Sequence, residues 1–222
     1  GCVVRCSNIY TDKDGNFITA SMEYETVALM GPNLKIFDMD KTAQLDRRCD
    51  EMGIDTIDGG TLLAMCMEVG KIEWGDADAA IALLDEMIEG TEFGRLMGTG
   101  ADNFGKAIGC KRIPTVKGQT IAAYDPRAES GMGISYSVST QGADHTFGAV
   151  FAPGAPREQK LKVAIEKQVI AATMDSFGCT LCTASFVLDD PTIMPDFLYG
   201  AFGIEMTNDE FLNIGRKTLM KI

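Results

Sequence analysis

The sequence has no long hydrophobic run and little positive charge. In 222 residues, no stretch approaches the ~20 consecutive apolar residues of a membrane-spanning helix, and none has the pattern of a secretory signal peptide. Lysine and arginine number 20 against 32 acidic residues, which gives a net charge of −12 and an isoelectric point of about 4.5. This balance argues against a nucleic-acid-binding protein, which needs a basic face, and against binding to an anionic membrane surface.

Histidine is scarce and cysteine is odd in number. His145 is the only histidine in the chain. The seven cysteines are Cys2, Cys6, Cys49, Cys66, Cys110, Cys179 and Cys182. An odd number without a secretory segment predicts a reducing, cytoplasmic compartment in which the thiols are free or bound to metal. Three of them, Cys49, Cys66 and Cys110, lie in or at the end of helical patterns, so we interpret these as small core residues.

Both ends of the sequence are unusual. The chain opens on Gly1-Cys2 without an initiating methionine, and its last residues, 219–222, lie inside a predicted helix. We therefore expect the chain to be a piece of a longer protein, with part of its chemistry completed by residues outside this sequence.

Hydrophobic periodicity predicts a mainly α fold with a small β-hairpin at residues 8–22, built around a strong turn signal, Asp12 to Asn16. Helices are predicted at residues 40–52, 61–69, 91–108 and 157–174, in a segment capped by Asp76, and in one that begins at Asn208 or Asp209. Residues 115–156 are rich in Gly, Ser, Thr and Pro and have little helical period. The change in character at Pro114 predicts two domains, residues 1–114 and 115–222.

One short pattern occurs twice. Residues 50–55 and the stretch that starts at Asp175 both read Asp, two residues, Gly, and each follows a predicted helix. A carboxylate can accept two hydrogen bonds from an amidine-like N–C–NH2 edge, as in a pterin or a guanine, and a glycine lets the backbone approach closely. A repeated loop of this kind favours a ligand that is held from two sides.

The other candidate site residues each have a non-functional interpretation as well. His145 lies next to Asp144 in a glycine-rich loop, a context that is compatible both with proton transfer and with the structural role that a lone histidine usually has. Glu23 and Glu25 are either solvated carboxylates or site residues. The Cys2-x-x-x-Cys6 spacing is compatible with zinc, with an iron–sulfur cluster or with incidental cysteines, and Cys179 and Cys182 would be the distant partners.

Six motifs in order over more than 170 residues resemble the tungsten-containing aldehyde:ferredoxin oxidoreductase family. They are Cys2-x-x-x-Cys6; Glu23-Tyr24-Glu25-Thr26 with Gly31-Pro32-Asn33; Cys49-Asp50-x-x-Gly53-Ile54-Asp55-Thr56-Ile57; Lys117-Gly118 through Ala123-Tyr124-Asp125-Pro126-Arg127; Gly142-Ala143-Asp144-His145-Thr146; and Asp175-Ser176-Phe177-Gly178. The resemblance implies two helical domains, the family's domains 2 (incomplete at its N-terminus) and 3 (truncated at its C-terminus), without the N-terminal β domain.

The resemblance also implies an activity. The family oxidises aldehydes to carboxylic acids at tungsten, sometimes molybdenum, held by two pyranopterin dithiolenes (molybdopterin). Electrons leave through a [4Fe–4S] cluster to ferredoxin or to an iron–sulfur electron-transfer subunit. The oligomeric state, including a homo-oligomer, stays open, and so does the aldehyde.

Specific residues follow from matching these motifs. The first pterin is assigned to Asp50, Gly53, Ile54 and Asp55, and the second to Asp175, Gly178, Cys179 and Thr180. Glu25, with Glu23 as the less favoured neighbour, and His145 would flank the metal and take the aldehyde's proton.

The cluster ligands are assigned to cysteines at both ends. Cys2 and Cys6 match the last two members of the family's Cys-x-x-Cys-x-x-x-Cys motif, whose first member would precede Gly1. The family's late loop reads Asp-x-x-Gly-Leu-Cys, whereas here Cys179 is the fifth residue and Thr180 the sixth. The resemblance then leaves three alternatives for the fourth ligand: Cys179 shifted by one position, Cys182 with a local rearrangement, or loss of the ligand. Some members have a lysine two residues after the histidine; here it is Phe147.

Two hypotheses of other classes remain beside the oxidoreductase. One is a non-catalytic or split-subunit scaffold that keeps the fold. The other is a zinc-binding helical module that uses the cysteines at positions 2, 6, 179 and 182.

Overall fold

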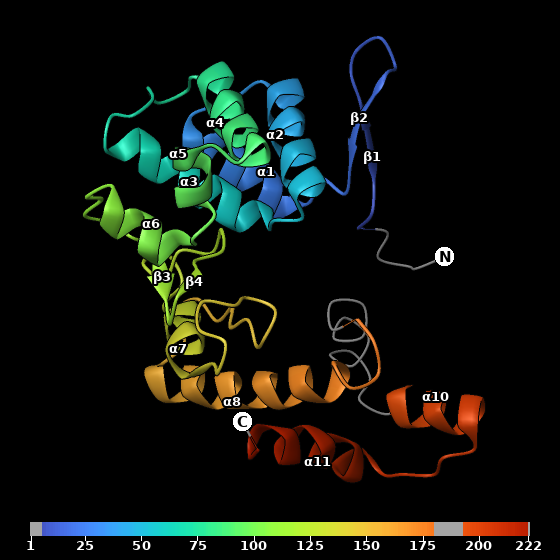
Figure 1. Cartoon of the computed structure of the whole chain (residues 1–222). Helices are drawn as coiled ribbons and strands as arrows, with labels where there is room; N and C mark the ends of the chain where they lie inside the picture. Colours follow the sequence, from blue (N-terminus) through green and yellow to red (C-terminus); the bar gives the residue numbers. More distant parts are fainter. Residues whose placement is uncertain (1–5, 180–192, 222) are drawn as a thin grey trace. The chain divides into compact units, whose positions relative to one another are not determined.

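A computed structural model describes residues 6–179 and 193–221 of the chain (Figure 1). The contacts divide it into two compact units, which we call the N-terminal unit, up to Ala123, and the C-terminal unit, from Tyr124 onward. Helices dominate both units, and the strands in the described residues form two small two-stranded sheets. The predicted mainly α fold is thereby confirmed. The predicted boundary at residue 114 concerns the family's domains and stays a prediction.

The N-terminal unit contains two hairpins and six α-helices among its described residues. Its elements are β1 Ile9–Thr11, β2 Phe17–Ala20, α1 Tyr24–Met30, the 3-10 helix η1 Pro32–Leu34, α2 Met39–Met52, α3 Thr56–Glu68, α4 Ala77–Glu89, α5 Glu92–Met97, α6 Ala101–Ala107, β3 Thr115–Val116 and β4 Gln119–Thr120. The C-terminal unit contains α7 Ser130–Val138, α8 Arg157–Met174, α10 Ile193–Phe202 and α11 Asn208–Leu219.

The predicted hairpin near the N-terminus is present. Its strands β1 and β2 pair antiparallel, with Tyr10 opposite Thr19. The Asp12 carboxylate closes the turn by accepting hydrogen bonds from the backbone N–H of Asp14 and Asn16. The Tyr10 hydroxyl donates to Asp40 Oδ1 at 2.9 Å, which fixes the hairpin to the first turn of α2.

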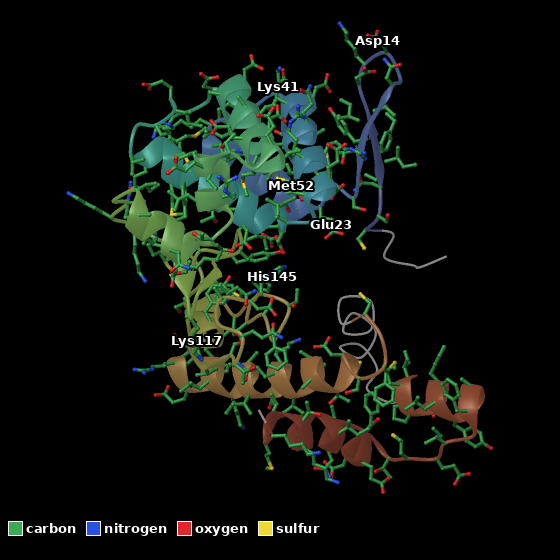
Figure 2. All side chains as sticks on the ribbon, in the orientation of Figure 1. Asp14, Glu23, Lys41, Met52, Lys117 and His145 are labelled. Carbon is green, nitrogen blue, oxygen red and sulfur yellow. The ribbon has the colours of Figure 1, made fainter. Side chains whose placement is uncertain are left out.

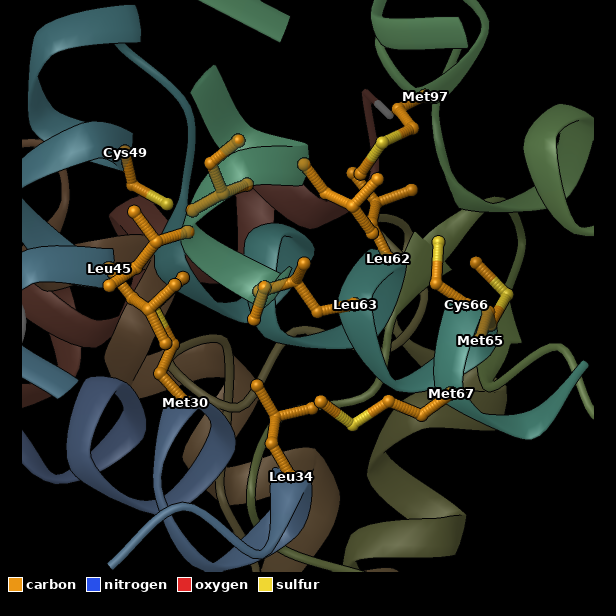
Figure 3. Close-up of a cluster of buried hydrophobic side chains, with 14 of the residues drawn as sticks. Met30, Leu34, Leu45, Cys49, Leu62, Leu63, Met65, Cys66, Met67 and Met97 are labelled. Carbon is orange, nitrogen blue, oxygen red and sulfur yellow. The ribbon is translucent and has the colours of Figure 1, made fainter. Parts of the chain in front are cut away.

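A single hydrophobic core holds α1 to α6 together. Figure 3 shows part of it, with Met30, Leu34, Leu45 and Leu63 converging from α1, η1, α2 and α3. Cys49 and Cys66 are fully buried in this cluster, and burial raises the pKa of each thiol to about 12. Both therefore stay protonated at neutral pH, which confirms that they are core residues. Among the described helices, none is both long and apolar enough to span a bilayer.

Helices α1 and α3 cross at very short range because α3 carries two glycines. A Cβ added to Gly60 would lie 2.8 Å from the carbonyl oxygen of Leu29, and one added to Gly59 would lie 2.7 Å from Met30 Cε. The sequence predicts this helix only from residue 61, after the glycine pair, but α3 begins earlier, at Thr56. The pair serves packing, and Asp55 caps the helix by accepting from the N–H of Ile57 at 2.7 Å.

Other helix starts also differ from the sequence prediction. Asp38, not Asp40, caps α2, since its carboxylate accepts from the N–H groups of Asp40 and Lys41. Thr207, not Asn208 or Asp209, caps α11 through a full capping box with Glu210. The predicted helix 91–108 is two helices, and residues 115–156 contain α7. In each case a local side-chain hydrogen bond or a glycine sets the helix boundary. Hydrophobic periodicity contains no information about such hydrogen bonds or glycines, so it does not predict these boundaries.

The C-terminal unit is built on α8, which packs along α11. Gly215 of α11 permits this, because a Cβ there would lie 2.3 Å from the carbonyl oxygen of Val169. Met174, Met194, Leu198 and Phe211 form a core between the end of α8 and helices α10 and α11.

We expect Gly60→Ala to lower the stability of the chain by about 1–3 kcal/mol, because the added methyl meets backbone and not a movable side chain. Thermal unfolding followed by circular dichroism measures the effect. Gly200→Ala in α10 is the matched control: a Cβ there has nothing within 4 Å, so alanine should stabilise the helix by up to about 1 kcal/mol. Equal melting temperatures for the two variants would contradict the close crossing.

Candidate functional site

The first predicted pterin loop lies between α2 and α3. Gly53 ends α2 in the left-handed conformation, with φ +71°, and the Ile54 N–H donates to the carbonyl of Cys49 at 3.0 Å. This is the turn expected for a glycine that follows a helix. Asp50 and Asp55 are exposed on either side of the turn, and a Cβ at Gly53 would meet nothing within 4 Å. The loop therefore presents two carboxylates beside an open stretch of backbone.

One of these two carboxylates, that of Asp55, also caps a helix. Asp55 Oδ1 accepts the N–H of Ile57 as the cap of α3. Asp50 is tied more loosely, because its nearest described partner is the hydroxyl of Thr19, 3.5 Å from Oδ2. Asp50 is thus the more available of the two for a ligand.

Glu25 lies in the first turn of α1 and is 9% exposed. Its Oε2 accepts the backbone N–H of Ala123 at 2.8 Å, while the neighbouring Tyr24 hydroxyl donates to the carbonyl of the same residue at 3.2 Å. The two side chains therefore fix the last residue of the N-terminal unit. Glu23, the less favoured candidate, is exposed at the cap position of α1, where its side chain is labelled in Figure 2.

The tip of α1 also meets the first predicted pterin loop. The hydroxyls of Thr26 and Thr56 are 2.9 Å apart, so the residue after Glu25 touches the residue after Asp55. In the same first turn of α3, Asp58 accepts a hydrogen bond from the Thr120 hydroxyl at 2.6 Å. Three segments that are distant in sequence, around residues 25, 55 and 120, are brought together at the N-terminal end of α3.

His145 lies in the C-terminal unit, in the loop between α7 and α8 (Figure 2). Its Nδ1 is 3.9 Å from Asp144 Oδ1, and its ring centroid is 5.5 Å from that of Tyr124. Tyr124 in turn packs edge-on against Phe151 at 5.0 Å. Asp144 is buried, and its carboxylate accepts from the N–H and the hydroxyl of Thr146. The loop holds the imidazole between an aromatic ring and a carboxylate.

The second predicted pterin loop follows α8. Asp175 is exposed at the helix end, and Gly178 has open space at its Cβ position. Partial burial raises the pKa of Asp175, and the negative charge of Asp144 raises it further. Asp175, in the second predicted pterin loop, and Asp144, next to His145, are therefore close enough to interact electrostatically within the C-terminal unit.

The two loops share residues but not conformation. At the first, the chain turns through the left-handed Gly53. At the second, Gly178 donates its N–H to the carbonyl of Met174 at 3.0 Å and does not adopt a positive φ. The α8 end therefore continues as further helical turn to Gly178, whereas α2 is closed sharply.

Two of the four predicted cluster ligands, Cys6 and Cys179, are among the residues that the structure describes. Cys6 is half-buried and Cys179 is exposed. Cys2, Thr180 and Cys182 lie outside the described residues. Within residues 6–179 and 193–221, no group of three or more His, Cys, Asp or Glu side chains is arranged to hold a metal ion.

Two residues of these sites carry no assigned role in the sequence analysis. Tyr124 belongs to the Tyr-Asp-Pro-Arg motif, but its contact with an imidazole 21 residues later becomes visible only in the fold. Asp46 is 2% exposed and lies 2.6 Å from the hydroxyl of Thr19, one turn before Asp50. A carboxylate four residues before a predicted ligand, on the same helix face, is the signal that could have indicated it.

A cavity of about 500 Å³ lies between α7 and α8, beside the buried ion pair of Lys160 and Glu129 (2.9 Å). None of the predicted site residues lines it.

Comparison with known proteins gives a consistent picture. Residues 1–220 match the family model described as aldehyde ferredoxin oxidoreductase, domains 2 and 3. A tungsten-containing aldehyde ferredoxin oxidoreductase of Pyrococcus furiosus is 29% identical over 90% of this chain and 37% of its own length. The protein of the same name from Pyrococcus horikoshii is 27% identical over 97% of the chain and 40% of its own length.

A third relative has a different name. The WOR-like subunit of an aliphatic sulfonate oxidoreductase of Pyrococcus furiosus is 31% identical over 66% of the chain and 27% of its own length. The chain spans well under half the length of the curated relatives it matches. Because the family model covers almost the whole sequence, and the described residues form a mainly α fold, the chain belongs to the aldehyde ferredoxin oxidoreductase family, in which it corresponds to domains 2 and 3.

Proposed function

We propose that the chain is the cofactor-binding part of an oxidoreductase that converts aldehydes to carboxylic acids at a tungsten or molybdenum bis-pyranopterin centre. The observation that carries the proposal is the pair of loops at residues 50–55 and 175–178. Each follows a helix and offers an exposed aspartate beside a glycine with open space. The match of residues 1–220 to the family model supports the same reading.

The residues present fit a pterin. The Asp50 carboxylate, with only a 3.5 Å contact to Thr19, can accept the paired hydrogen bonds of an N–C–NH2 edge. Asp55 can add its Oδ2, because the cap of α3 uses Oδ1. Gly53 and Ile54 leave the backbone accessible. In the second loop, Asp175, Gly178, Cys179 and Thr180 would take the equivalent part.

Aldehyde oxidation adds one oxygen from water to the carbonyl carbon and releases two protons and two electrons. Asp50, Asp55 and Asp175 would hold the tungsten or molybdenum cofactor, which would supply a two-electron acceptor. Cys2, Cys6 and Cys179 or Cys182 would hold a [4Fe–4S] cluster, which would supply one-electron transfer to ferredoxin or to an iron–sulfur subunit. The protein's own groups must take the protons. His145, held against Tyr124 and beside the buried Asp144, is placed to accept one of these protons.

Glu25 has a narrower role in this proposal. Its Oε2 is engaged by the N–H of Ala123, so the carboxylate is held at one end of α1 and cannot rotate freely. A carboxylate fixed in this way can orient a water molecule or a substrate group. We further propose that the protein is cytoplasmic, because an odd number of cysteines, seven in this chain, is typical of a reducing compartment.

A second candidate substrate is supported by the relative named as a subunit of an aliphatic sulfonate oxidoreductase. In that case the same loops would hold the cofactor, and the substrate would be an aliphatic sulfonate. Turnover of the full-length protein with a panel of aldehydes and of aliphatic sulfonates separates the two candidates.

Metal analysis of the full-length protein tests the proposal directly. We expect tungsten or molybdenum together with about four irons per chain. Zinc alone would support the zinc-binding helical module, and absence of every metal would support the non-catalytic scaffold.

We expect His145→Ala to reduce aldehyde oxidation by the full-length enzyme about 100-fold or more while the metal content stays unchanged, because proton transfer is lost and the pterin loops are intact. Steady-state turnover and metal analysis of the same samples measure this. Gln141→Ala, an exposed position in the same loop, is the control. Unchanged turnover in His145→Ala would remove the proton-transfer role.

Asp55→Asn should separate capping from cofactor binding. Asparagine caps a helix as well as aspartate does, so the melting temperature should hardly change, whereas the lost charge should weaken pterin retention. Asp76→Asn is the matched control, since Asp76 caps α4 in the same way and lies in no predicted site. Equal pterin content in the two variants would show that Asp55 is a cap only.

A further inference from the structure

The strongest unassigned feature is a buried carboxyl next to the first pterin loop. Asp46 is 2% exposed and Thr19, on strand β2, is fully buried against it. Thr19 Oγ1 lies 2.6 Å from Asp46 Oδ2 and 3.5 Å from Asp50 Oδ2. One hydroxyl thus lies between a buried carboxyl and the exposed aspartate that is assigned to the pterin.

A hydroxyl has one hydrogen and can donate it to only one carboxylate at a time. If Asp46 is ionised, that hydrogen belongs to Asp46, and Asp50 faces the oxygen lone pairs of Thr19. If Asp46 is protonated, its own O–H can donate to Thr19 Oγ1, which frees the threonine hydrogen to point at Asp50. The protonation state of Asp46 therefore decides whether Asp50 is held.

The surroundings favour the protonated form. Burial raises the pKa of Asp46, the hydrogen bond from Thr19 offsets part of this rise, and the charge of Asp50 adds to it. The Cys49 thiol on the same helix is neutral. Strand β2 and helix α1 contribute the hydroxyls of Thr19 and Thr26, and both arginines next to Asp46 on α2 are paired elsewhere, with Glu51 and Asp85.

We propose that Asp46 is a proton-dependent positioning residue, which in its protonated form donates to Thr19 and so directs the Thr19 hydroxyl to the Asp50 carboxylate. The inference rests on the proposed function, because it gives Asp50 the role of a pterin ligand. It adds a regulatory property: the first pterin is held more firmly at pH values below the raised pKa of Asp46 than above it.

The sign of the stability effect follows from the same shift. The folded state holds the Asp46 proton more tightly than the unfolded chain does. Below the ordinary aspartate pKa, Asp46 is protonated in both the folded and the unfolded state, so its ionisation does not lower the free energy of unfolding. As the pH rises from there through the raised pKa, ionisation of the buried group lowers the free energy of unfolding.

Infrared titration of the chain tests the coupling without any cofactor. Between about pH 4 and about pH 8, the carbonyl stretch of a protonated carboxylic acid should persist above the pH at which exposed aspartates ionise. Asp46→Asn should remove the Asp46 part of this signal and leave that of Asp175, whose pKa is also raised, whereas Asp14→Asn, an exposed control, should leave the whole signal unchanged. The titration midpoint should move to lower pH in Asp50→Asn, which removes a like charge, and to higher pH in Thr19→Val, which removes the hydrogen bond. An unchanged midpoint in both variants would overturn the proposal.

Pterin retention by the full-length protein then tests positioning. Asp46→Asn imitates the protonated acid, so its retention should be independent of pH, whereas the wild-type protein should lose pterin as the pH rises. Thr19→Val should retain the pterin about tenfold less well, as is typical when a group that orients a ligand is removed. If metal is present and both variants behave as wild type, Asp46 does not position Asp50 and the proposed function stands. If the wild-type protein carries no tungsten or molybdenum, the proposed function fails independently of the infrared result.

Discussion

The close crossing of α1 and α3 is the contact on which the rest of the N-terminal unit depends. Backbone meets backbone there, because Gly60 leaves no side chain between α3 and the carbonyl of Leu29. Because the two backbones are in contact at Gly60, sliding or rotation of one helix against the other would produce a steric clash. The first turn of α1 and the cap of α3 are therefore held in one arrangement, in which Thr26 and Thr56 share a hydrogen bond. Glu25 and Asp55 are the neighbours of these two threonines, so a packing constraint places two predicted site residues.

The excess of negative charge has a local explanation as well as a general one. Several carboxylates cap helices: Asp38, Asp55, Asp76 and Glu129 accept backbone N–H groups at the starts of α2, α3, α4 and α7. Such positions favour a negative charge, since the N–H groups of the first turn point at it. Accordingly, the pKa of Glu129 is lowered, first by its hydrogen bond from Gly131 and then by Lys160. Part of the acidity is thus required by the architecture, besides keeping the surface charged.

The two Asp-x-x-Gly loops illustrate how one sequence pattern can end helices differently. After α2, the chain reverses through a left-handed glycine because α3 must start at once and pack back on α1. After α8, the helical turns continue to Gly178, and the aspartate lies near the charge of Asp144. The pattern specifies an exposed carboxylate and an accessible backbone in both places. It does not specify the turn, which depends on where the next element packs.

The sequence by itself determined the fold class, the hairpin, the helix that ends at Gly53, the buried state of Cys49 and Cys66, and the family. The fold class, the helix end and the buried cysteines follow from local hydrophobic periodicity, and the hairpin follows from its turn residues. The family follows from the order of short motifs along the sequence. It did not determine the caps at Asp38 and Thr207, or the start of α3, because one hydrogen bond decides each of these. Only the tertiary structure placed Tyr124 against His145, Thr26 against Thr56, and Thr19 between Asp46 and Asp50. Those contacts join residues up to 31 positions apart, and which of them form depends on how closely helices pack, a property that no local pattern records.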